Sequence, residues 1–235
     1  MSRRLRDGDF ALGDQLPSEY ELAAEFGVSR ATVRTAIGSL VQRGLVVQRR
    51  GIGNFAAIGA RLTNDLAEAV DFNVLVERSG SRVDVVFDDA RLEPAPDHVA
   101  DALGIGAQEA VFRAAKRFMA NENPLIYVVN SISESVLGPT LAAEVVERPD
   151  LTEPLFTFLE HSVGVSTSFQ LASLRAELGS EIDYPGAELD STIPVLRFEE
   201  VGYTAENRAI WHSTNWFPPS AMQFELVRRR VGAGL

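Results

Sequence analysis

Cysteine is absent from the 235-residue chain, and histidine occurs only three times, as His98, His161 and His212. Without cysteine the chain can form no disulfide, thiolate zinc site or cysteine nucleophile. The three histidines lie far apart in the sequence, which disfavours a histidine-based metal cluster. We therefore expect no metal and no other cofactor.

Long apolar runs are also missing. No run of about 18 consecutive apolar residues occurs, and Met1-Ser2-Arg3-Arg4 leads into no apolar signal core. We expect a soluble, cytoplasmic protein without a membrane partner. Hydrophobic residues still make up 46% of the chain, which is enough for a folded core.

Charge is distributed unevenly along the chain. The formal net charge is −11, but residues 1–55 carry eight arginines and six acidic residues, so this segment has a net charge of +2. Because a nucleic-acid-binding surface is local, this segment is a candidate for contact with phosphates. The remainder carries −13, and its acidity keeps it away from phosphates.

The first 57 residues have the pattern of two helices and a β-hairpin. Ser18 and Glu21 form the signature of a capping box, and Gly27 ends the first helix. Ser29 can cap a second helix over residues 30–43, in which apolar residues recur at helical spacing. Gly44 is placed to end that helix. Two strands, at 45–49 and 54–57, follow.

This segment closely resembles the GntR family of bacterial regulators. The residues that carry the resemblance are Leu16-Pro17-Ser18-Glu19, Glu21-Leu22-Ala23, Phe26-Gly27-Val28-Ser29-Arg30, Thr32-Val33-Arg34, Leu40, Gly44-Leu45 and Arg50-Gly51-Ile52-Gly53-Asn54-Phe55. The resemblance implies a winged helix-turn-helix that binds double-stranded DNA. Tyr20 and Ile52 depart from it, because many relatives have a basic residue there. Only Met1–Asp9 corresponds to the family's first helix, so we expect the natural protein to start upstream of Met1.

The expected DNA contacts come from the start of the second helix and from the hairpin tip. A recognition helix presents its first turn to base edges, where arginine pairs with guanine or holds a phosphate. Serine and threonine are short donors to backbone oxygens, and glycines let the wing approach the minor groove. Arg43 is interpreted as a solvated surface residue. The expected DNA-binding residues are Ser29, Arg30, Thr32, Arg34, Arg49, Arg50, Gly51 and Gly53.

Beyond a linker at 58–70, the pattern changes to alternating strands, which predicts an α+β domain with an antiparallel sheet over residues 71–235. Turns are expected at Asn121-Glu122-Asn123-Pro124 and Ala205-Glu206-Asn207-Arg208. Strands are expected at 83–87, 111–119, 125–132, 195–204 and 210–217, and short helices at 97–103, 154–163 and 184–190. On strict alternation, Trp211, Ser213 and Asn215 share one face, and His212, Thr214 and Trp216 share the other.

This second part resembles, more loosely, the UTRA effector-binding domain of the HutC subfamily, which is related in fold to chorismate lyase. The carrying residues are Asp71-Phe72, Gly80, Leu103-Gly104-Ile105, Lys116-Arg117-Phe118, Asn123-Pro124-Leu125, Ile193-Pro194-Val195-Leu196, Glu199, Val201, Tyr203-Thr204, Ile210, Phe217 and Phe224-Glu225-Leu226. The resemblance implies a cleft that binds a small-molecule effector. By position, the expected effector-binding residues are Asp71, Phe72, Asn73, Lys116, Phe118, Asn130, Tyr203, Trp211 and Phe217.

The expected cleft has fewer charges and more aromatic surface than that of several relatives. Phe118, Val128 and Trp211 stand where those relatives have a basic residue and two glutamates. This composition favours an aromatic or apolar ligand, and Lys116 could still pair with a carboxylate or phosphate. The alternative is that Trp211 and Phe217 are core residues.

The resemblance implies a repressor, not an enzyme, that an effector releases from its operator. It also implies a homodimer on a palindromic operator, because one winged helix reads only a few base pairs. A lyase-like enzyme and a regulator relative that has lost DNA binding are the alternatives. No compact acid–base constellation supports the enzyme.

Overall fold

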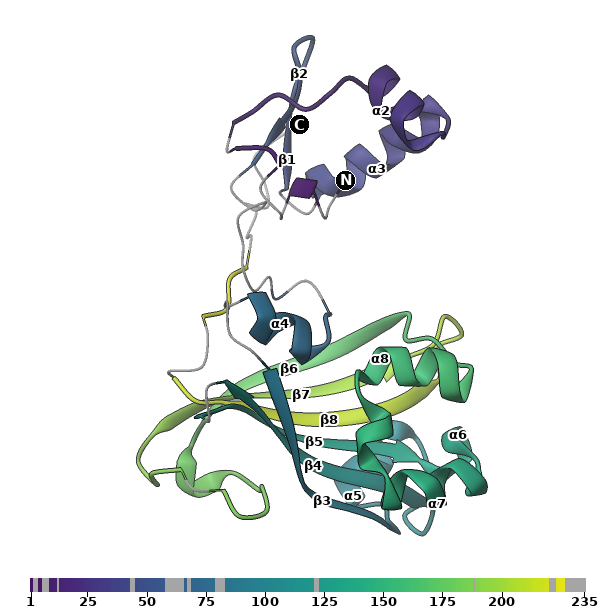
Figure 1. Cartoon of the computed structure of the whole chain (residues 1–235), viewed down its shortest axis with the longest axis vertical. Helices are drawn as coiled ribbons and strands as arrows, with labels where there is room; N and C mark the ends of the chain where they lie inside the picture. Colours follow the sequence, from purple (N-terminus) through teal and green to yellow (C-terminus); the bar gives the residue numbers. More distant parts are fainter. Residues whose placement is uncertain are drawn as a thin grey trace. The chain divides into compact units, whose positions relative to one another are not determined.

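The structure is a computed structural model of the whole chain (Figure 1). It describes residues 1, 4–5, 9–11, 13–42, 45–57, 66, 69–78, 83–120, 123–187, 189–219 and 223–226. These residues divide into two compact units, one formed by the described parts of 1–68 with 223–226 and one by those of 69–219. Arg43, Gly44, Gly80, the 121–122 part of the first expected turn and all of the linker except Leu66, Ala69 and Val70 lie outside the described residues.

The first unit contains the expected two helices and hairpin. Helix α2 (Glu19–Phe26) is followed by α3 (Arg30–Gln42), and the strands β1 (Val46–Arg49) and β2 (Gly53–Ala56) pair antiparallel. The capping box is confirmed, because Ser18 Oγ accepts from Glu21 N at 3.2 Å and Glu21 Oε2 accepts from Ser18 N at 2.7 Å. Gly27 ends α2 in the left-handed conformation, at φ 64°.

Among the described residues of this unit, an apolar cluster packs the helices and the hairpin together. Val33, Ile37 and Leu40 form the buried stripe of α3, as the helical spacing predicts. They pack with Leu22 of α2 and with Leu5, whose side chain is 1% exposed. The apolar residues near the chain start therefore contribute to this core.

The second unit is built on a six-stranded sheet in which every pair is antiparallel, as predicted. The strand order is β3-β4-β5-β8-β7-β6. The strands are β3 (Val83–Pro94), β4 (Ala110–Ala120), β5 (Asn123–Ser133), β6 (Phe169–Leu178), β7 (Pro194–Tyr203) and β8 (Ala209–Phe217).

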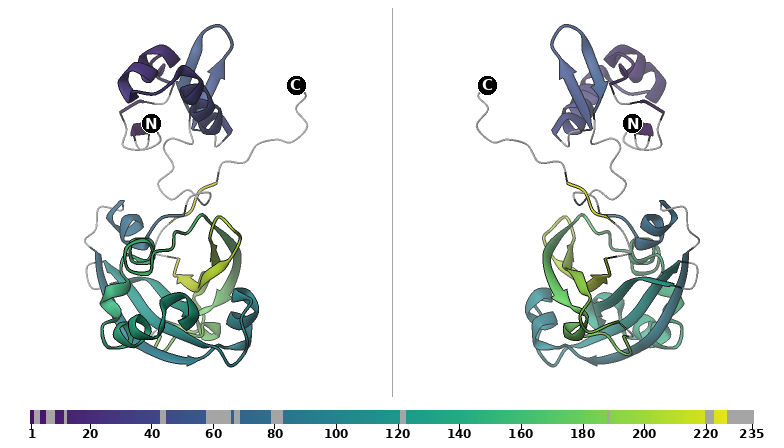
Figure 2. Two further views of the ribbon diagram at one scale, coloured as in Figure 1. Left: turned by 90° about the vertical axis from the view of Figure 1, so that its right-hand side faces the viewer. Right: turned by 90° about the vertical axis from the view of Figure 1, so that its left-hand side faces the viewer.

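Helices cover both faces of this sheet (Figures 1 and 2). We call the two sides the α7/α8 face and the α5 face. Phe112 and Ala114 pack under α7 and α8, whereas Val111, which points to the other side of the same strand, packs under α5. The helices are α4 (Phe72–Arg78), α5 (Asp97–Leu103), α6 (Glu134–Leu137), α7 (Pro139–Glu147), η2 (Pro149–Thr152), α8 (Leu155–Phe158), η3 (Leu159–Val163) and η4 (Gly179–Glu181).

The structure corrects one helix that was expected in this unit and adds elements that were not expected. The helix expected at 184–190 is wrong, because Pro185 and Gly186 form a turn, in which Gly186 has φ 68°. Strand β6 and helices α4, α6 and α7 were not anticipated. The expected turn at 205–208 is confirmed as the β7–β8 connection. Among the described helices, none is long and apolar enough to cross a membrane.

Candidate DNA interface and effector site

The start of α3 is an exposed polar surface with a fixed geometry. Ser29 Oγ accepts from Thr32 N at 3.1 Å, and the two hydroxyl oxygens lie 2.9 Å apart. Arg30 is the first residue of the helix and is exposed. Arg34 lies one turn later and forms an ion pair with Glu19 of α2. The hydrogen bonds from Arg34 lower the pKa of Glu19 below its ordinary value.

The wing is shaped by two glycines with positive φ, Gly51 at 74° and Gly53 at 144°. The second is a backbone conformation that residues with a side chain rarely adopt. Gln15 Nε2 donates to Ile52 O at 3.0 Å and braces the tip of the hairpin. The guanidinium of Arg49 lies 4.4 Å from the centre of the Phe55 ring, which fixes its direction.

A groove of about 1160 Å³ lies between the start of the two helices and the wing. Arg30, Arg49 and Arg50 all line it, together with Gln15 and Tyr20. Three arginines along one groove are suited to a nucleic-acid backbone. The sequence interpretation did not include Gln15. Its contact with the wing joins two segments that are far apart in the sequence, and no local pattern predicts such a contact.

The aromatic part of the expected effector site is assembled by α4. The ring of Phe72 meets Phe118 at 5.5 Å and Phe217 at 5.7 Å between ring centres, in both cases edge to face. Phe198 of β7 joins them at 4.8 Å from Phe217. Residues from the start of the unit, from the central strands and from near the end of the sheet therefore meet on the α7/α8 face; that they contact an effector stays a prediction.

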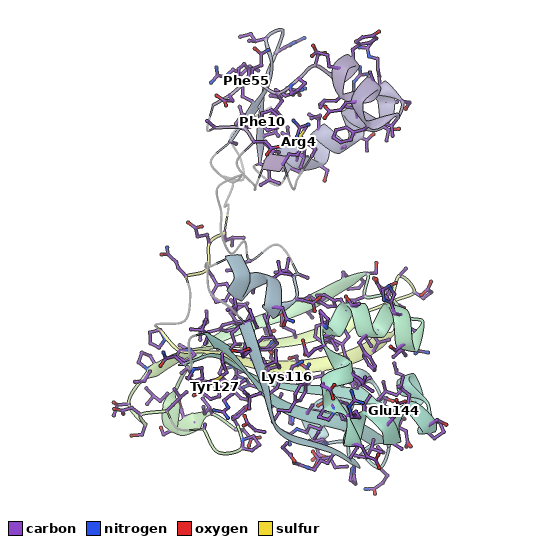
Figure 3. The ribbon with its side chains drawn as sticks, viewed as in Figure 1. Arg4, Phe10, Phe55, Lys116, Tyr127 and Glu144 are labelled. Atoms are coloured by element: carbon purple, nitrogen blue, oxygen red, sulfur yellow. The ribbon has the colours of Figure 1, made fainter. Side chains whose placement is uncertain are left out.

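Lys116 is the charged centre of this site (Figure 3). Its side chain is 2% exposed and forms an ion pair with Glu153, while its ammonium lies 5.7 and 5.5 Å from the ring centres of Phe87 and Phe118. Burial lowers the pKa of Lys116 to about 7, against the charge of Asp71, which raises it. In its charged form, a lysine this buried requires an anion beside it.

Asp71 connects the site to the segment that carries Glu153. Its Oδ1 accepts from Phe156 N at 3.3 Å, at the start of α8. Burial raises the pKa of Asp71, although this hydrogen bond and the charge of Lys116 lower it. Asn73 Oδ1 is buried without a hydrogen-bond partner among the described residues.

A chain of buried polar side chains continues along the same face. The Ser213 hydroxyl lies 2.8 Å from Asn130 Oδ1 and 2.6 Å from Asn215 Oδ1. Asn215 Nδ2 and Gln170 Nε2 each donate to Glu200 at 2.7 Å. Burial raises the pKa of Glu200 to about 7 despite these two hydrogen bonds, which lower it. Asn130 is thus the end of a network whose other members the sequence interpretation missed.

Trp211 and Tyr203 are placed differently from the other expected residues. Trp211 packs in the apolar core under α7 and α8, and its Nε1 donates to Thr167 Oγ1 at 3.0 Å. Gly202 lies directly beneath it, since a Cβ there would be 2.0 Å from Trp211 Nε1. Tyr203 stacks on Phe169 at 5.1 Å. The core interpretation of Trp211 therefore fits these contacts better than direct ligand contact.

Within the described part of the chain, no group of three or more histidine or acidic side chains is arranged to hold a metal ion.

A helix-turn-helix with an arginine-lined wing, in one chain with a sheet unit that carries a buried cluster of charged and aromatic side chains, defines a transcription regulator with a ligand-binding domain. Residues 1–55 match the family described as bacterial regulatory proteins, gntR family, and residues 78–223 match the UTRA domain. The chain therefore belongs to the GntR family of DNA-binding transcriptional regulators and carries a UTRA effector-binding domain.

Named relatives agree with this assignment. The "Probable transcriptional regulator PhnF" of Escherichia coli (strain K12) is 30% identical over 188 residues, which cover 80% of this chain and 75% of that protein. The "HTH-type transcriptional repressor NagR" of Bacillus subtilis (strain 168) is 25% identical over 91% of this chain and 85% of its own length. The crystal structure of the "possible transcriptional regulator YydK" from Bacillus subtilis shares the fold, with a TM-score of 0.74 at 19% identity, over 97% of this chain and 95% of that chain.

Proposed function

We propose that this protein is a repressor that binds a palindromic operator and is released from it by an aromatic organic acid. The observation that carries the proposal is the buried ion pair of Lys116 with Glu153 among phenylalanine rings. NagR, a relative over most of the chain, is named a transcriptional repressor. DNA binding places the proposed site of action in the cytoplasm.

The class of effector follows from the groups around Lys116. A carboxylate on the ligand can replace that of Glu153 beside the ammonium, so that the buried cation keeps an anionic partner. The edges of Phe72, Phe118 and Phe217 offer an apolar surface on which an aromatic ring can pack. Asn130 and the polar network behind it supply hydrogen-bonding groups for a further substituent.

The proposed coupling runs through the segment that carries Glu153. Leu155 and Phe156, two and three residues further on, donate their backbone N–H groups to Asp71. A ligand that displaces Glu153 therefore shifts the start of α8 and its bond to Asp71. Asp71 directly precedes α4 and comes soon after the residues that connect the two units. The effector can release DNA only if it binds the two conformations with different affinity.

On the DNA side, we propose that Arg30 and Arg34 contact base edges, with Ser29 and Thr32 at the backbone. Arg49, Arg50, Gly51 and Gly53 of the wing approach the adjacent backbone and minor groove. The side chains that would make these contacts at the start of α3 are all exposed: Ser29, Arg30, Thr32 and Arg34. Two copies are needed to read a palindrome, so the proposed state is a homodimer. Light scattering that shows a strict monomer at micromolar concentration would contradict the dimer.

The test uses the full chain and an operator selected from random duplex DNA. Aromatic carboxylates are screened by thermal shift, because a ligand that is specific for the folded state raises the melting temperature. The expected hit raises the melting temperature and weakens operator binding in the wild type. In Lys116→Met, operator binding without ligand persists and the response to the hit is lost. Failure of every carboxylate, or an undiminished response of Lys116→Met, contradicts the proposed effector class.

A further inference from the structure

The α5 face of the sheet contains a pocket, on the side of the sheet opposite the Lys116 site. It has a volume of about 140 Å³, several times the share of one water molecule in the liquid. Three central strands and β7 form its floor, and His98 and Val99 of α5 form part of its wall. The floor residues used below are Arg113, Ser131, His212, Thr214, Trp216 and Arg197.

The strand register places Arg113, Ser131 and His212 side by side. Arg113 of β4 pairs with Ser131 of β5, and Ser131 pairs with His212 of β8. Trp216, four residues beyond His212 on β8, pairs with Arg197 of β7. Lys116 and Asn130 occupy the intervening positions of β4 and β5, so their side chains point to the opposite face.

Three hydrogen-bond donors on this floor are buried and unused. Ser131 Oγ, Arg113 Nε and Arg197 Nε have no hydrogen-bond partner among the residues that the structure describes. Ser131 as a whole is only 1% exposed. A buried donor left unsatisfied typically costs about 1–3 kcal/mol. Three such donors around one space indicate that an acceptor belongs there.

The carboxylates that line the same space are already engaged or turned outward. Glu177 accepts from Arg197 Nη1 at 3.0 Å with one oxygen and from Trp216 Nε1 at 3.1 Å with the other. Glu181 accepts from Leu178 N at 2.7 Å. The Asp183 side chain is 91% exposed. The buried side-chain atoms that lack a partner among these lining residues are therefore all donors, within the part of the chain that the structure describes.

We propose that this cavity is a second ligand site that binds a small carboxylate at the neighbouring donors of Arg113 and Ser131. The two carboxylate oxygens accept from these donors, and Val129 and Trp216 provide the apolar wall against which the ligand's carbon atoms pack. The volume admits a ligand of a few heavy atoms. The site does not depend on the effector proposal, because the Lys116 site lies across the sheet.

The two tryptophans of the chain provide the readout, because they point to opposite faces. In the ¹⁵N-labelled full-length protein, the indole N–H signals of Trp216 and Trp211 are followed during a titration with sodium acetate. Ionic strength is held constant with sodium chloride. We expect the Trp216 signal to shift and saturate while the Trp211 signal stays in place. The same result is expected in Lys116→Met, whose change is on the other face.

Ser131→Ala removes one donor and should weaken acetate binding by about tenfold or more, the usual loss for a hydrogen bond to a charged group. Ser133→Ala is the matched control. It is on the same strand and face and is equally buried, but its hydroxyl donates to Glu109 at 2.7 Å, outside the cavity. A Trp216 shift that does not saturate, an equal shift of Trp211, or an unchanged acetate affinity in Ser131→Ala would overturn the proposal.

Discussion

Arg34 of α3 is held by Glu19, the first residue of α2. Arg34 Nη2 lies 2.9 Å from Glu19 Oε2, and Nε lies 3.2 Å from the same oxygen. The Glu19 side chain is 19% exposed and that of Arg34 is 67% exposed. The carboxylate therefore fixes the direction of a guanidinium whose outer edge remains open to a partner.

Glu19→Gln should lower the discrimination of the protein between operator and random DNA. Without the carboxylate, Arg34 moves freely, so its specific contact weakens. The loss of one negative charge strengthens non-specific attraction to phosphates. Titrations of operator and random duplex at two salt concentrations measure both effects. Glu25→Gln, on the same helix, is the control. An unchanged ratio of the two affinities would show that the pair does not position Arg34 for DNA.

Arg34→Ala and Arg30→Ala should each weaken operator binding by about 1–3 kcal/mol if the side chain contacts a guanine edge. The loss should be smaller on random DNA, because a base contact carries the sequence information. Electrophoretic mobility shift or fluorescence anisotropy measures both affinities. Arg148→Ala, in an exposed ion pair of the other unit, is the control. Wild-type operator affinity in both variants would rule out the proposed role of α3.

Gly53→Ala should destabilise the wing and weaken operator binding. A side chain at φ 144° is strained, and the new Cβ would lie 2.7 Å from Gln15 Nε2. Backbone strain of this kind typically costs about 1–3 kcal/mol. The matched control is Gly38→Ala in α3, where nothing lies within 4 Å of the new Cβ. That change should stabilise the helix by about 0.5–1 kcal/mol. Urea unfolding measures the change in stability of each variant. Equal changes in Gly53→Ala and Gly38→Ala would contradict the backbone strain expected at Gly53.

Local chemistry explains which features of the fold were predictable. The capping box of Ser18 with Glu21 and the left-handed Gly27 depend on neighbours in sequence, and both are found as predicted. The alternation of β8 correctly placed Ser213 and Trp216 on opposite faces, because a strand has a period of two. The helix expected at 184–190 failed because Pro185-Gly186 favours a turn over helix continuation.

The site was less predictable, because its charges come from remote segments. The resemblance placed Lys116 and Phe72 in the cleft, and the structure brings them together through Phe118. Nothing in the sequence near Glu153 indicates that it pairs with Lys116, since that contact depends on how α8 packs on the sheet. Glu200 was missed for a similar reason. An acidic residue on an alternating strand is usually interpreted as solvent-facing.

Glu153→Gln should destabilise the protein and strengthen binding of the proposed aromatic acid. Removing one partner of a buried ion pair typically costs about 3 kcal/mol or more, and here it leaves Lys116 with only the charge of Asp71 nearby. The ligand carboxylate then no longer competes with Glu153. Urea unfolding and calorimetric titration measure the two effects. Glu147→Gln, an exposed change in α7, should leave both unchanged. Weaker ligand binding in Glu153→Gln would contradict the proposed exchange of carboxylates.

Glu200→Gln should remove a pH dependence of stability. Burial raises the pKa of Glu200 from 4.5 to about 7, so between these values the folded state binds more protons than the unfolded state. The contribution of Glu200 to the free energy of unfolding is therefore fully present below about pH 4.5 and is lost as the pH rises through about 7. The amide introduced by the substitution does not titrate. Like the protonated carboxyl, it keeps one carbonyl oxygen as an acceptor, whereas Asn215 and Gln170 donate to different oxygens of Glu200.

The variant and the wild type should thus be similar in stability near pH 4.5, and the variant should be more stable by roughly 2–3 kcal/mol at pH 8. The titration of Lys116 is common to both proteins and cancels in the difference. Urea unfolding across this pH range measures it, with Glu206→Gln in the exposed β7–β8 turn as the control. A difference between Glu200→Gln and the wild type that stays constant with pH would show that Glu200 does not titrate in this window.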